Sequence, residues 1–312
     1  MTEDNKKRQD LLFLILLIFF IGVVALFNYS VDPYNVTKAK IINGFNDNKI
    51  HKLTNKRSNI YADIKLNKKN KDKAFVGNCL LSETNDTPNN IAFFSIPVVK
   101  MEEVVDIIKN LHITAPNINT IYWGLYFDDF YNEQNNAFGE KFTFSDEKFL
   151  TVKDCIDLFF SFNTTKYSIE TVKESIKNKD NNDKYIFPYK ELANKEYNQD
   201  LNFHELDKVK EAVQYAKDNN IKLILYYSPI HITKKEHIYL SGKWESFEKL
   251  KIYLAKITPY FDYSLYNEYN STVLDENNKY YLDSIHLQPS YNNLIISDLI
   301  SNDKKIGVEV TE

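Results

Sequence analysis

Two short segments of the chain carry residues that could together perform nucleophilic catalysis. Residues 77–80 (GNCL) follow a short apolar run, and residues 283–286 (DSIH) lie near the C-terminal end. A cysteine thiolate is a strong nucleophile, a histidine can take the thiol proton, and an aspartate can hold the imidazole in the required tautomer. We therefore predict a catalytic group made of Cys79, His286 and Asp283.

Cys79 also has a plain structural interpretation. Free cysteine is among the most often buried residue types, so a thiol at a strand end can be a small core residue without a chemical role. Beside a histidine, by contrast, the pKa of a cysteine falls well below its usual ~8.5 and the thiolate forms readily. Ser82, about one turn further along the chain, is the alternative nucleophile.

Further residues are candidates for binding substrate or for stabilising an oxyanion: Asn78, Asp128, Ser228 and His231. Asp128 and Asp129 could form a pair of acid–base carboxylates, or place one side chain inward and the other in solvent. His231 is expected to line the rim of the pocket or to lie on a loop. A metal site built from His231, His237 and a carboxylate is an alternative, but the prediction is that the protein holds no metal and no cofactor.

These candidates need a scaffold that brings several strand ends together. Short apolar runs predict strands at 74–76, 91–94, 121–125, 221–227 and 259–263. Apolar residues at helical spacing predict helices at 98–111, 205–219, 244–257 and 290–301. Strands that alternate with helices favour an α/β fold with a mostly parallel sheet flanked by helices. Sites in such folds gather at the carboxyl ends of the strands, where 77–80 and 283–286 would meet.

Residues 11–27 (LLFLILLIFFIGVVALF) carry no charge. A bilayer core is crossed by about 17–25 such residues, and the absence of a polar face argues against a soluble core helix. A cleaved signal peptide is the remaining alternative. The basic residues at 6–8 precede the helix, which predicts a cytoplasmic N-terminus and an extracytoplasmic C-terminal domain at the cytoplasmic membrane. Asp32 and Pro33 should end the helix.

The predicted organisation follows from these segments: a cytoplasmic tail at 1–10, a transmembrane helix at 11–27, a juxtamembrane segment at 28–70 and an α/β domain at 71–312. The stretch at about 130–200 has no regular pattern and is rich in Phe, Tyr, Asn and Lys. We interpret it as an insertion or lid near the carboxyl edge of the sheet.

Composition excludes several classes of protein. Hydrophobic residues make up 43% of the chain and aromatic residues 14%, which is typical of a globular protein. The net charge is −4 and no basic block is interleaved with aromatics, so nucleic acid is not expected as a partner. The seven glycines form neither a GxGxxG pattern nor a Walker-type loop, which removes the usual sequence support for a nucleotide-binding fold.

The sequence resembles the SGNH (GDSL-like) hydrolase superfamily, whose first block is Gly-Asp-Ser or Gly-Ser-Ser and whose last is Asp-x-x-His. Within it, the chain is similar to the membrane-anchored bacterial group related to teichoic acid D-alanylation and alginate O-acetylation proteins. The resemblance extends from about Tyr34 to Ile300, and residues 280–289 (YYLDSIHLQP) carry it most specifically. Other matching segments are the anchor, 32–34 (DPY), 77–79 (GNC), 121–130, 228–231 (SPIH) and Trp244.

This resemblance implies a flavodoxin-like, three-layer domain outside the cytoplasm that acts as an acyltransferase or esterase on a cell-envelope polysaccharide. Cys79 would replace the family's serine, and a partner membrane acyltransferase would supply the acyl donor. The chain departs from the family pattern at the oxyanion donors. Residues 94–96 lack the glycine of the second block, and Asp128 and Asp129 stand where the third block has asparagine.

Loss of one oxyanion donor costs on the order of 10²–10³ in rate. The sequence therefore leaves a second interpretation open, in which the domain is catalytically inactive and binds glycan or scaffolds an envelope assembly.

Overall fold

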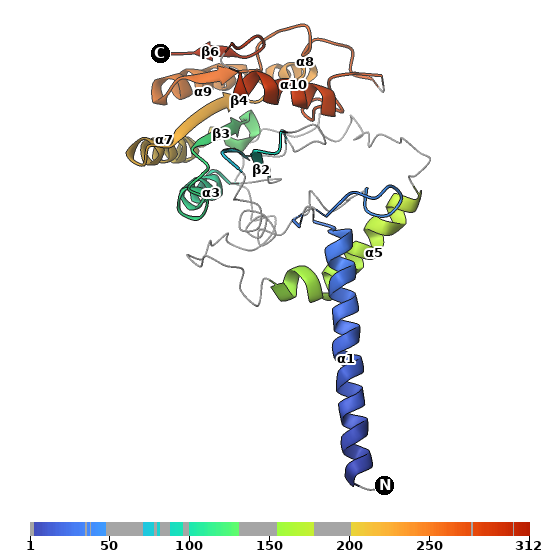
Figure 1. Ribbon diagram of the computed structural model, residues 1–312. Coiled ribbons are helices and arrows are strands. Elements are labelled where there is room, and N and C mark those ends of the chain that lie inside the picture. The colour runs from blue at the N-terminus through green and yellow to red at the C-terminus, as the bar shows by residue number, and fades with distance from the viewer. Residues whose placement is uncertain are drawn as a thin grey trace. The chain divides into compact units, whose positions relative to one another are not determined.

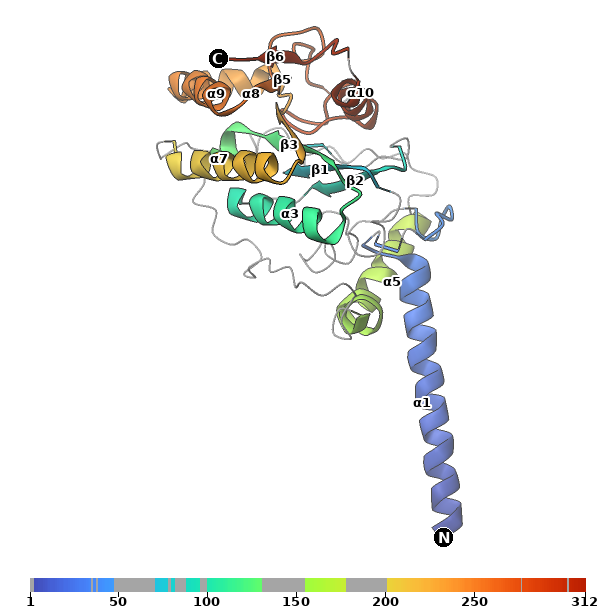
Figure 2. The same ribbon diagram turned by 60° about the vertical axis from the view of Figure 1, so that its left-hand side comes forward.

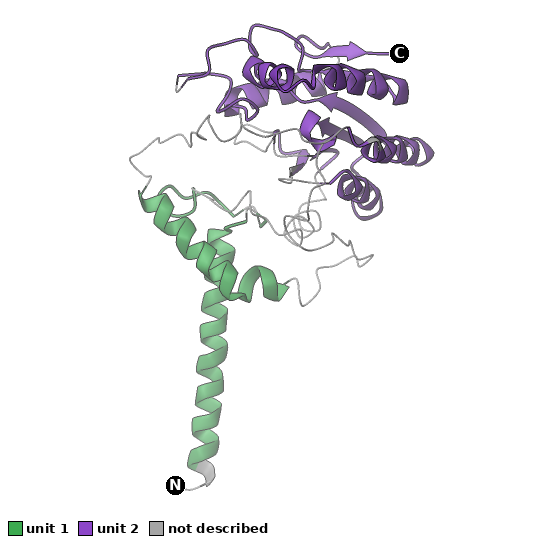
Figure 3. Ribbon diagram, turned by 180° about the vertical axis from the view of Figure 1, so that it is seen from behind, with its two compact units in different colours: residues 1–67, 145–183 green, residues 68–144, 184–312 purple. Residues whose placement is uncertain are grey.

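The structure is a computed structural model that describes residues 3–34, 36–37, 39–47, 71–77, 80–81, 88–95, 100–130, 155–177, 201–275, 277–301 and 303–312 (Figure 1; Figure 2). The chain divides into two compact units (Figure 3). The first contains Met1–Asn67 and Ser145–Asp183, and the second contains Lys68–Phe144 and Lys184–Glu312. Part of the segment interpreted as an insertion, at 145–183, thus belongs to the same unit as the N-terminal helix.

The first unit begins with α1 (Glu3–Val31), a helix of 29 residues. Its apolar side chains are exposed, and the helix is long and apolar enough to cross a membrane, as the sequence predicted. The predicted end of the helix is confirmed: Asp32 adopts a φ of 49° directly after it. The Asp32 carboxylate accepts hydrogen bonds from the backbone N–H groups of Val36, Thr37 and Ala39, which fixes the turn that leads away from the helix.

Two helical segments pack against the C-terminal part of α1: η4 (Ile156–Phe160), a π-helix, and α5 (Phe162–Lys177). The expectation of an irregular segment is therefore wrong at 156–177. The sequence pattern did not predict α5 because this helix buries hydroxyl side chains and leaves apolar ones exposed. A helix that packs on a soluble core has the opposite pattern.

The second unit is an α/β domain built on a six-stranded sheet with strand order β2-β1-β3-β4-β5-β6. The parallel strands are β1 (Lys73–Gly77), β2 (Ile91–Ser95), β3 (Thr120–Leu125), β4 (Lys222–Tyr227) and β5 (Tyr260–Asp262). All five correspond to predicted strands. β6 (Val308–Val310) pairs antiparallel with β5, and its short, mostly exposed sequence gave no signal.

Helices cover both faces of this sheet. The α-helices in the described part of this unit are α3 (Met101–Thr114), α7 (Phe203–Asp218), α8 (Ile232–Leu240), α9 (Trp244–Ile257) and α10 (Pro289–Ile300). Alternate residues of β1, β3 and β4 point to the face covered by α10, where Phe75, Tyr122 and Tyr226 join an aromatic-rich core. On the other face α7 packs against both α3 and α9, and α3 and α7 lie side by side (Figure 2).

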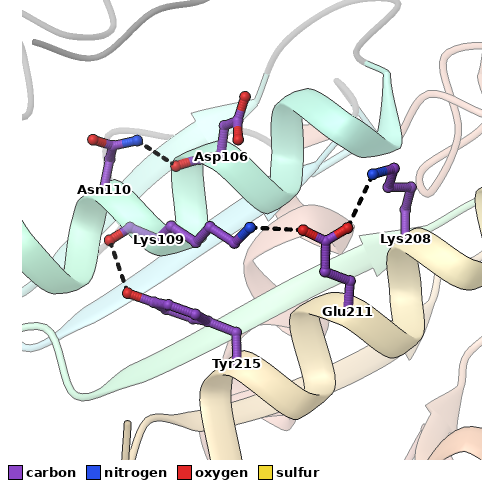
Figure 4. A network of polar contacts seen from close by, with 6 residues as sticks. All are labelled: Asp106, Lys109, Asn110, Lys208, Glu211 and Tyr215. Carbon is purple, nitrogen blue, oxygen red and sulfur yellow. Dashed lines mark hydrogen bonds and ion pairs between the residues drawn. The ribbon is translucent and has the colours of Figure 1, made fainter. Parts of the chain in front are cut away.

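A polar network joins α3 to α7 on the surface (Figure 4). The carboxylate of Glu211 forms ion pairs with Lys109 at 2.6 Å and with Lys208 at 2.9 Å, and the hydroxyl of Tyr215 donates to the carbonyl of Lys109. The two ammonium groups lower the pKa of Glu211, Lys109 having the larger effect. Because these side chains are partly exposed, the network contributes little to stability.

Candidate functional site

The segment before α10 folds into a tight loop that presents Asp283 and His286. Tyr281 and Leu287 form an antiparallel bridge on either side of it, and the N–H of Leu282 donates to the carbonyl of His286 at 2.8 Å. Inside the loop, Oδ1 of Asp283 accepts the backbone N–H groups of Ile285 and His286, each at 2.8 Å. The backbone of the loop therefore fixes the direction in which the carboxylate points.

The second carboxylate oxygen, Oδ2 of Asp283, lies 2.7 Å from Nδ1 of His286. The Asp283 side chain is 1% exposed and that of His286 is 23% exposed, so the pair runs from the interior toward solvent. Burial raises the pKa of Asp283, but the hydrogen bonds from the ring and the backbone of His286 and from Ile285 outweigh it, and the pKa lies below its usual value. An ionised Asp283 keeps a proton on Nδ1, so Nε2 is the basic nitrogen of a neutral ring.

Two buried asparagines, which the sequence did not single out, hold this loop in place. Oδ1 of Asn278 accepts the N–H groups of Tyr280 and Tyr281. Oδ1 of Asn270 accepts the hydroxyl groups of Tyr281 and Tyr291, while its Nδ2 donates to backbone carbonyls. Asparagine often makes such local bonds in turns, but only the structure shows that these two position the candidate site.

The chain after β1 reaches the hydrophobic cluster that contains the flanks of this loop. Gly77 has a φ of +132°, and a Cβ at this position would lie 2.7 Å from the carbonyl oxygen of Gly124 on β3, so the position requires glycine. Leu81 belongs to the same hydrophobic cluster as Tyr281 and Leu287, the two residues that flank the Asp283–His286 loop.

Three predicted residues of this segment, Asn78, Cys79 and Ser82, lie outside the described residues. Gly77 and Leu80 on either side of the first two are both described and buried.

Ser228 and His231 lie in the loop that follows β4. The N–H of His231 donates to the carbonyl of Ser284 at 3.0 Å, which joins the loop after β4 to the Asp283–His286 loop. The hydroxyl of Ser228 is buried and has no hydrogen-bond partner among the residues that the structure describes.

The ring of His231 serves as the N-cap of α8. Its Nε2 lies 2.7 Å from the carbonyl of Thr272, and its Nδ1 accepts the N–H of Thr233. Burial lowers the pKa of His231, the charge of Lys235 adds to this effect, and the bond to Thr272 opposes it, so the pKa lies below its usual value. Both ring nitrogens of a neutral His231 are thus used by the fold, and the side chain is 1% exposed rather than at an open rim.

Asp128 and Asp129 lie in η3 (Phe127–Phe130), a 3₁₀ turn after β3. The carboxylate of Asp128 is buried and pairs with Lys234 at 3.1 Å, whereas Oδ2 of Asp129 accepts the N–H of Tyr126. These contacts give the two carboxylates different structural tasks.

No group of three His, Cys, Asp or Glu side chains suited to hold a metal ion occurs among the described residues. His231 and His237, the histidines of the alternative metal site, both lie within that part of the chain.

Comparison of the chain with models of protein families, with characterised proteins and with solved structures finds no match. Function has therefore to be inferred from the residues themselves. Among the described residues, the site consists of a buried Asp283 with a lowered pKa, bonded to a partly exposed His286. Leu81, which follows β1 in the chain, belongs to the same hydrophobic cluster as the two residues that flank this pair.

Proposed function

We propose that the chain is an extracytoplasmic, SGNH-like enzyme that transfers or hydrolyses an acyl group on a cell-envelope polysaccharide. The observation that supports this most strongly is the contact between Asp283 and His286, which leaves Nε2 of the ring as a proton acceptor. The domain would be a flavodoxin-like, three-layer member of that superfamily, with Cys79 as its nucleophile.

The proposed reaction has two steps. The thiol of Cys79 gives its proton to Nε2 of His286, and the thiolate attacks the acyl carbonyl, so that a thioester forms and the leaving alcohol takes the proton back from the imidazolium. A hydroxyl of the polysaccharide, or water in the esterase case, then loses a proton to His286 and attacks the thioester. This releases the product and restores the thiol. Asp283 holds the ring in position and stabilises its charged form.

The membrane helix suits such a role. If α1 spans the cytoplasmic membrane with the basic residues at 6–8 inside, the rest of the chain lies on the envelope side. A membrane acyltransferase would then supply the acyl group as a partner, since the chain itself carries no nucleotide-type motif that could activate a carboxylic acid.

One observation favours a second candidate function, a catalytically inactive domain that binds glycan or scaffolds an envelope assembly. Asp128 and His231, proposed from the sequence as substrate-binding residues, are buried and engaged by Lys234, Thr233 and Thr272. An enzyme would then have to obtain its oxyanion donors from other groups.

Acylation of the full-length protein in detergent micelles separates the two. Cys155 is a half-buried free cysteine, so the experiment uses a Cys155→Ser background in which Cys79 is the remaining thiol. The protein is incubated with p-nitrophenyl acetate, and peptide mass spectrometry locates any acetyl group.

The enzyme hypothesis requires an adduct on Cys79 that disappears in His286→Gln and is strongly reduced in Asp283→Asn. A folded protein whose Cys79 takes up neither acetate nor a thiol-alkylating probe would contradict it and favour the binding domain.

A further inference from the structure

In helix α5 the polar face is buried and the apolar face is exposed, the opposite of an amphipathic helix in a soluble protein. Its buried face is made of small hydroxyl residues: Thr164, Ser168, Thr171 and Ser175. Its large apolar residues are exposed, Phe162 at 83%, Ile169 at 44% and Ile176 at 62%. In water this arrangement leaves apolar area in solvent. Against lipid it is the expected one, because membrane helices pack through small and hydroxyl residues and turn apolar side chains outward.

The exposed residues form two neighbouring rows along the helix. Phe162, Ile169 and Ile176 are seven positions apart, so they lie along one line, and Lys166, Lys173 and Lys177 follow on its flank. All six are exposed. An apolar row beside lysines is typical of a helix that lies in a membrane interface, where the aliphatic stems cover lipid and the ammonium groups reach the phosphates. With its charged side chains, α5 is not suited to span the bilayer.

The position of α5 within its unit agrees with an interface. Nδ2 of Asn28, directly after the apolar run of α1, donates to the carbonyl of Phe159 at 2.7 Å and to Oγ1 of Thr165 at 3.0 Å. The rings of Tyr29 and Phe159 also meet, with centroids 6.2 Å apart. α5 therefore contacts α1 where the apolar segment ends. Figure 1 and Figure 3 show α5 crossing α1 near the end of α1 that is farther from the N-terminus.

Apolar exposure continues into the preceding turn. Ile156 and Phe160 of η4 are 50% and 43% exposed, while Leu158 between them is buried with Tyr34 and Val36. The exposed apolar side chains thus begin beside the end of α1 and continue along α5.

We propose that the outer face of α5, defined by Phe162, Ile169 and Ile176, lies in the lipid interface on the side of the membrane where α1 ends. The lysine row contacts the head groups there. This inference rests on the proposed insertion of α1 into a membrane. It adds a second membrane contact, which holds the juxtamembrane part of the chain against the bilayer instead of leaving it on a free tether.

Spin-label accessibility tests this directly. The full chain, with Cys79 and Cys155 replaced by serine, carries a single cysteine at position 169 or 176 and is reconstituted into vesicles of phosphatidylethanolamine and phosphatidylglycerol. Collision with oxygen, which partitions into lipid, is compared with collision with a neutral nickel chelate, which stays in water. Leu17→Cys reports on the insertion of α1. Ile113→Cys, also apolar and 59% exposed but on α3 of the other unit, is the matched control.

Labels at 169 and 176 should show an oxygen-to-nickel ratio several-fold above that at Ile113 and below that at Leu17, as expected for residues near the boundary of head groups and acyl chains. If Leu17 is lipid-exposed but positions 169 and 176 match Ile113, the inference is overturned while the anchor stands, and this face of α5 is left to a protein partner. If Leu17 is itself in water, anchoring fails, and the interfacial helix with it. A circular-dichroism melt of each variant verifies that the labelled chain is folded.

Discussion

Asp283→Asn should invert the tautomer of His286 while leaving the loop folded. Oδ1 of Asp283 accepts two backbone N–H groups at 2.8 Å, so the amide oxygen of asparagine must occupy that position. The amide nitrogen then faces Nδ1 of His286, which lies 2.7 Å from Oδ2 in the native pair. Two donors cannot share a hydrogen bond, so the ring proton has to move from Nδ1 to Nε2.

The expected magnitudes follow from the bonds that are lost. A hydrogen bond to a charged group contributes about 1.5–3 kcal/mol and a neutral one about 0.5–1.5 kcal/mol, so Asp283→Asn should lower the free energy of unfolding by roughly 1–2 kcal/mol. Asp283→Ala should cost about 3–5 kcal/mol, because it also leaves two backbone N–H groups unpaired. If His286 is a general base, the asparagine variant should lose on the order of 10³–10⁴ in acyl-transfer rate, since Nε2 no longer accepts a proton.

Long-range ¹H–¹⁵N spectra of the histidine rings measure the tautomer. The chain has six histidines, and His286→Gln assigns the signal of interest. The native ring should be protonated on Nδ1 and the ring in Asp283→Asn on Nε2. Urea unfolding supplies the stabilities. An asparagine variant that keeps the Nδ1 proton, or one that is as unstable as Asp283→Ala, would refute the derived geometry.

Three further predictions concern the elements that support the site. Gly77→Ala should lower the free energy of unfolding by about 2–5 kcal/mol, because a φ of +132° is strained for alanine and its Cβ would meet the carbonyl of Gly124; an unchanged thermal midpoint would argue against this packing. Asp298→Ala should lower the free energy of unfolding, measured in urea, by about 3–5 kcal/mol, because Asp298 accepts the Tyr263 hydroxyl at 2.8 Å and three backbone N–H groups. A loss below about 1 kcal/mol would contradict those bonds. The pKa of His231 is lowered in the folded state, so the unfolded chain binds more protons as the pH falls below about 6.5. As the pH falls, the free energy of unfolding of the native protein should therefore decrease relative to that of His231→Gln, by at most about 1.4 kcal/mol per pH unit. Parallel curves of stability against pH for the two proteins would refute this.

The sheet could be predicted because its strands are continuous apolar runs bounded by glycine, asparagine or proline. β4 (KLILYY) is buried at its end and is followed by Ser228 and Pro229, which stop it. α9 and α10 show the helical spacing of a helix with one buried face, and both begin within one residue of the expected position.

The elements that were missed lack that pattern. α8 (ITKKEHIYL) has only two buried positions, Lys234 and Ile238, and starts from a histidine cap that sequence rules do not weigh. α5 carries its apolar residues on the exposed face, so its periodicity did not indicate a soluble core. In both cases the deciding interactions are made with distant parts of the chain.

At the candidate site, sequence reasoning proposed residues but could not say what most of the described ones contact. Asp283 and His286 are three positions apart and bond within one turn, so their contact is local and predictable. Asp128 and Lys234 are 106 positions apart, and the pairing of His231 with Thr272 spans 41. Only the fold reveals these partners. They form hydrogen bonds with side chains that the sequence analysis had predicted to bind a substrate.

The central claim is that His286 acts on Cys79, and the pH dependence of Cys79 alkylation tests it most directly. Iodoacetamide reacts with the thiolate, so its rate against pH, measured in the full-length Cys155→Ser protein, gives the pKa of Cys79. A Cys79–His286 pair should titrate well below ~8.5 and react in the neutral range, and His286→Gln should move the titration up to or above that value. Equal profiles in the two proteins, or a thiol that does not react at any pH at which the protein is folded, would contradict the claim.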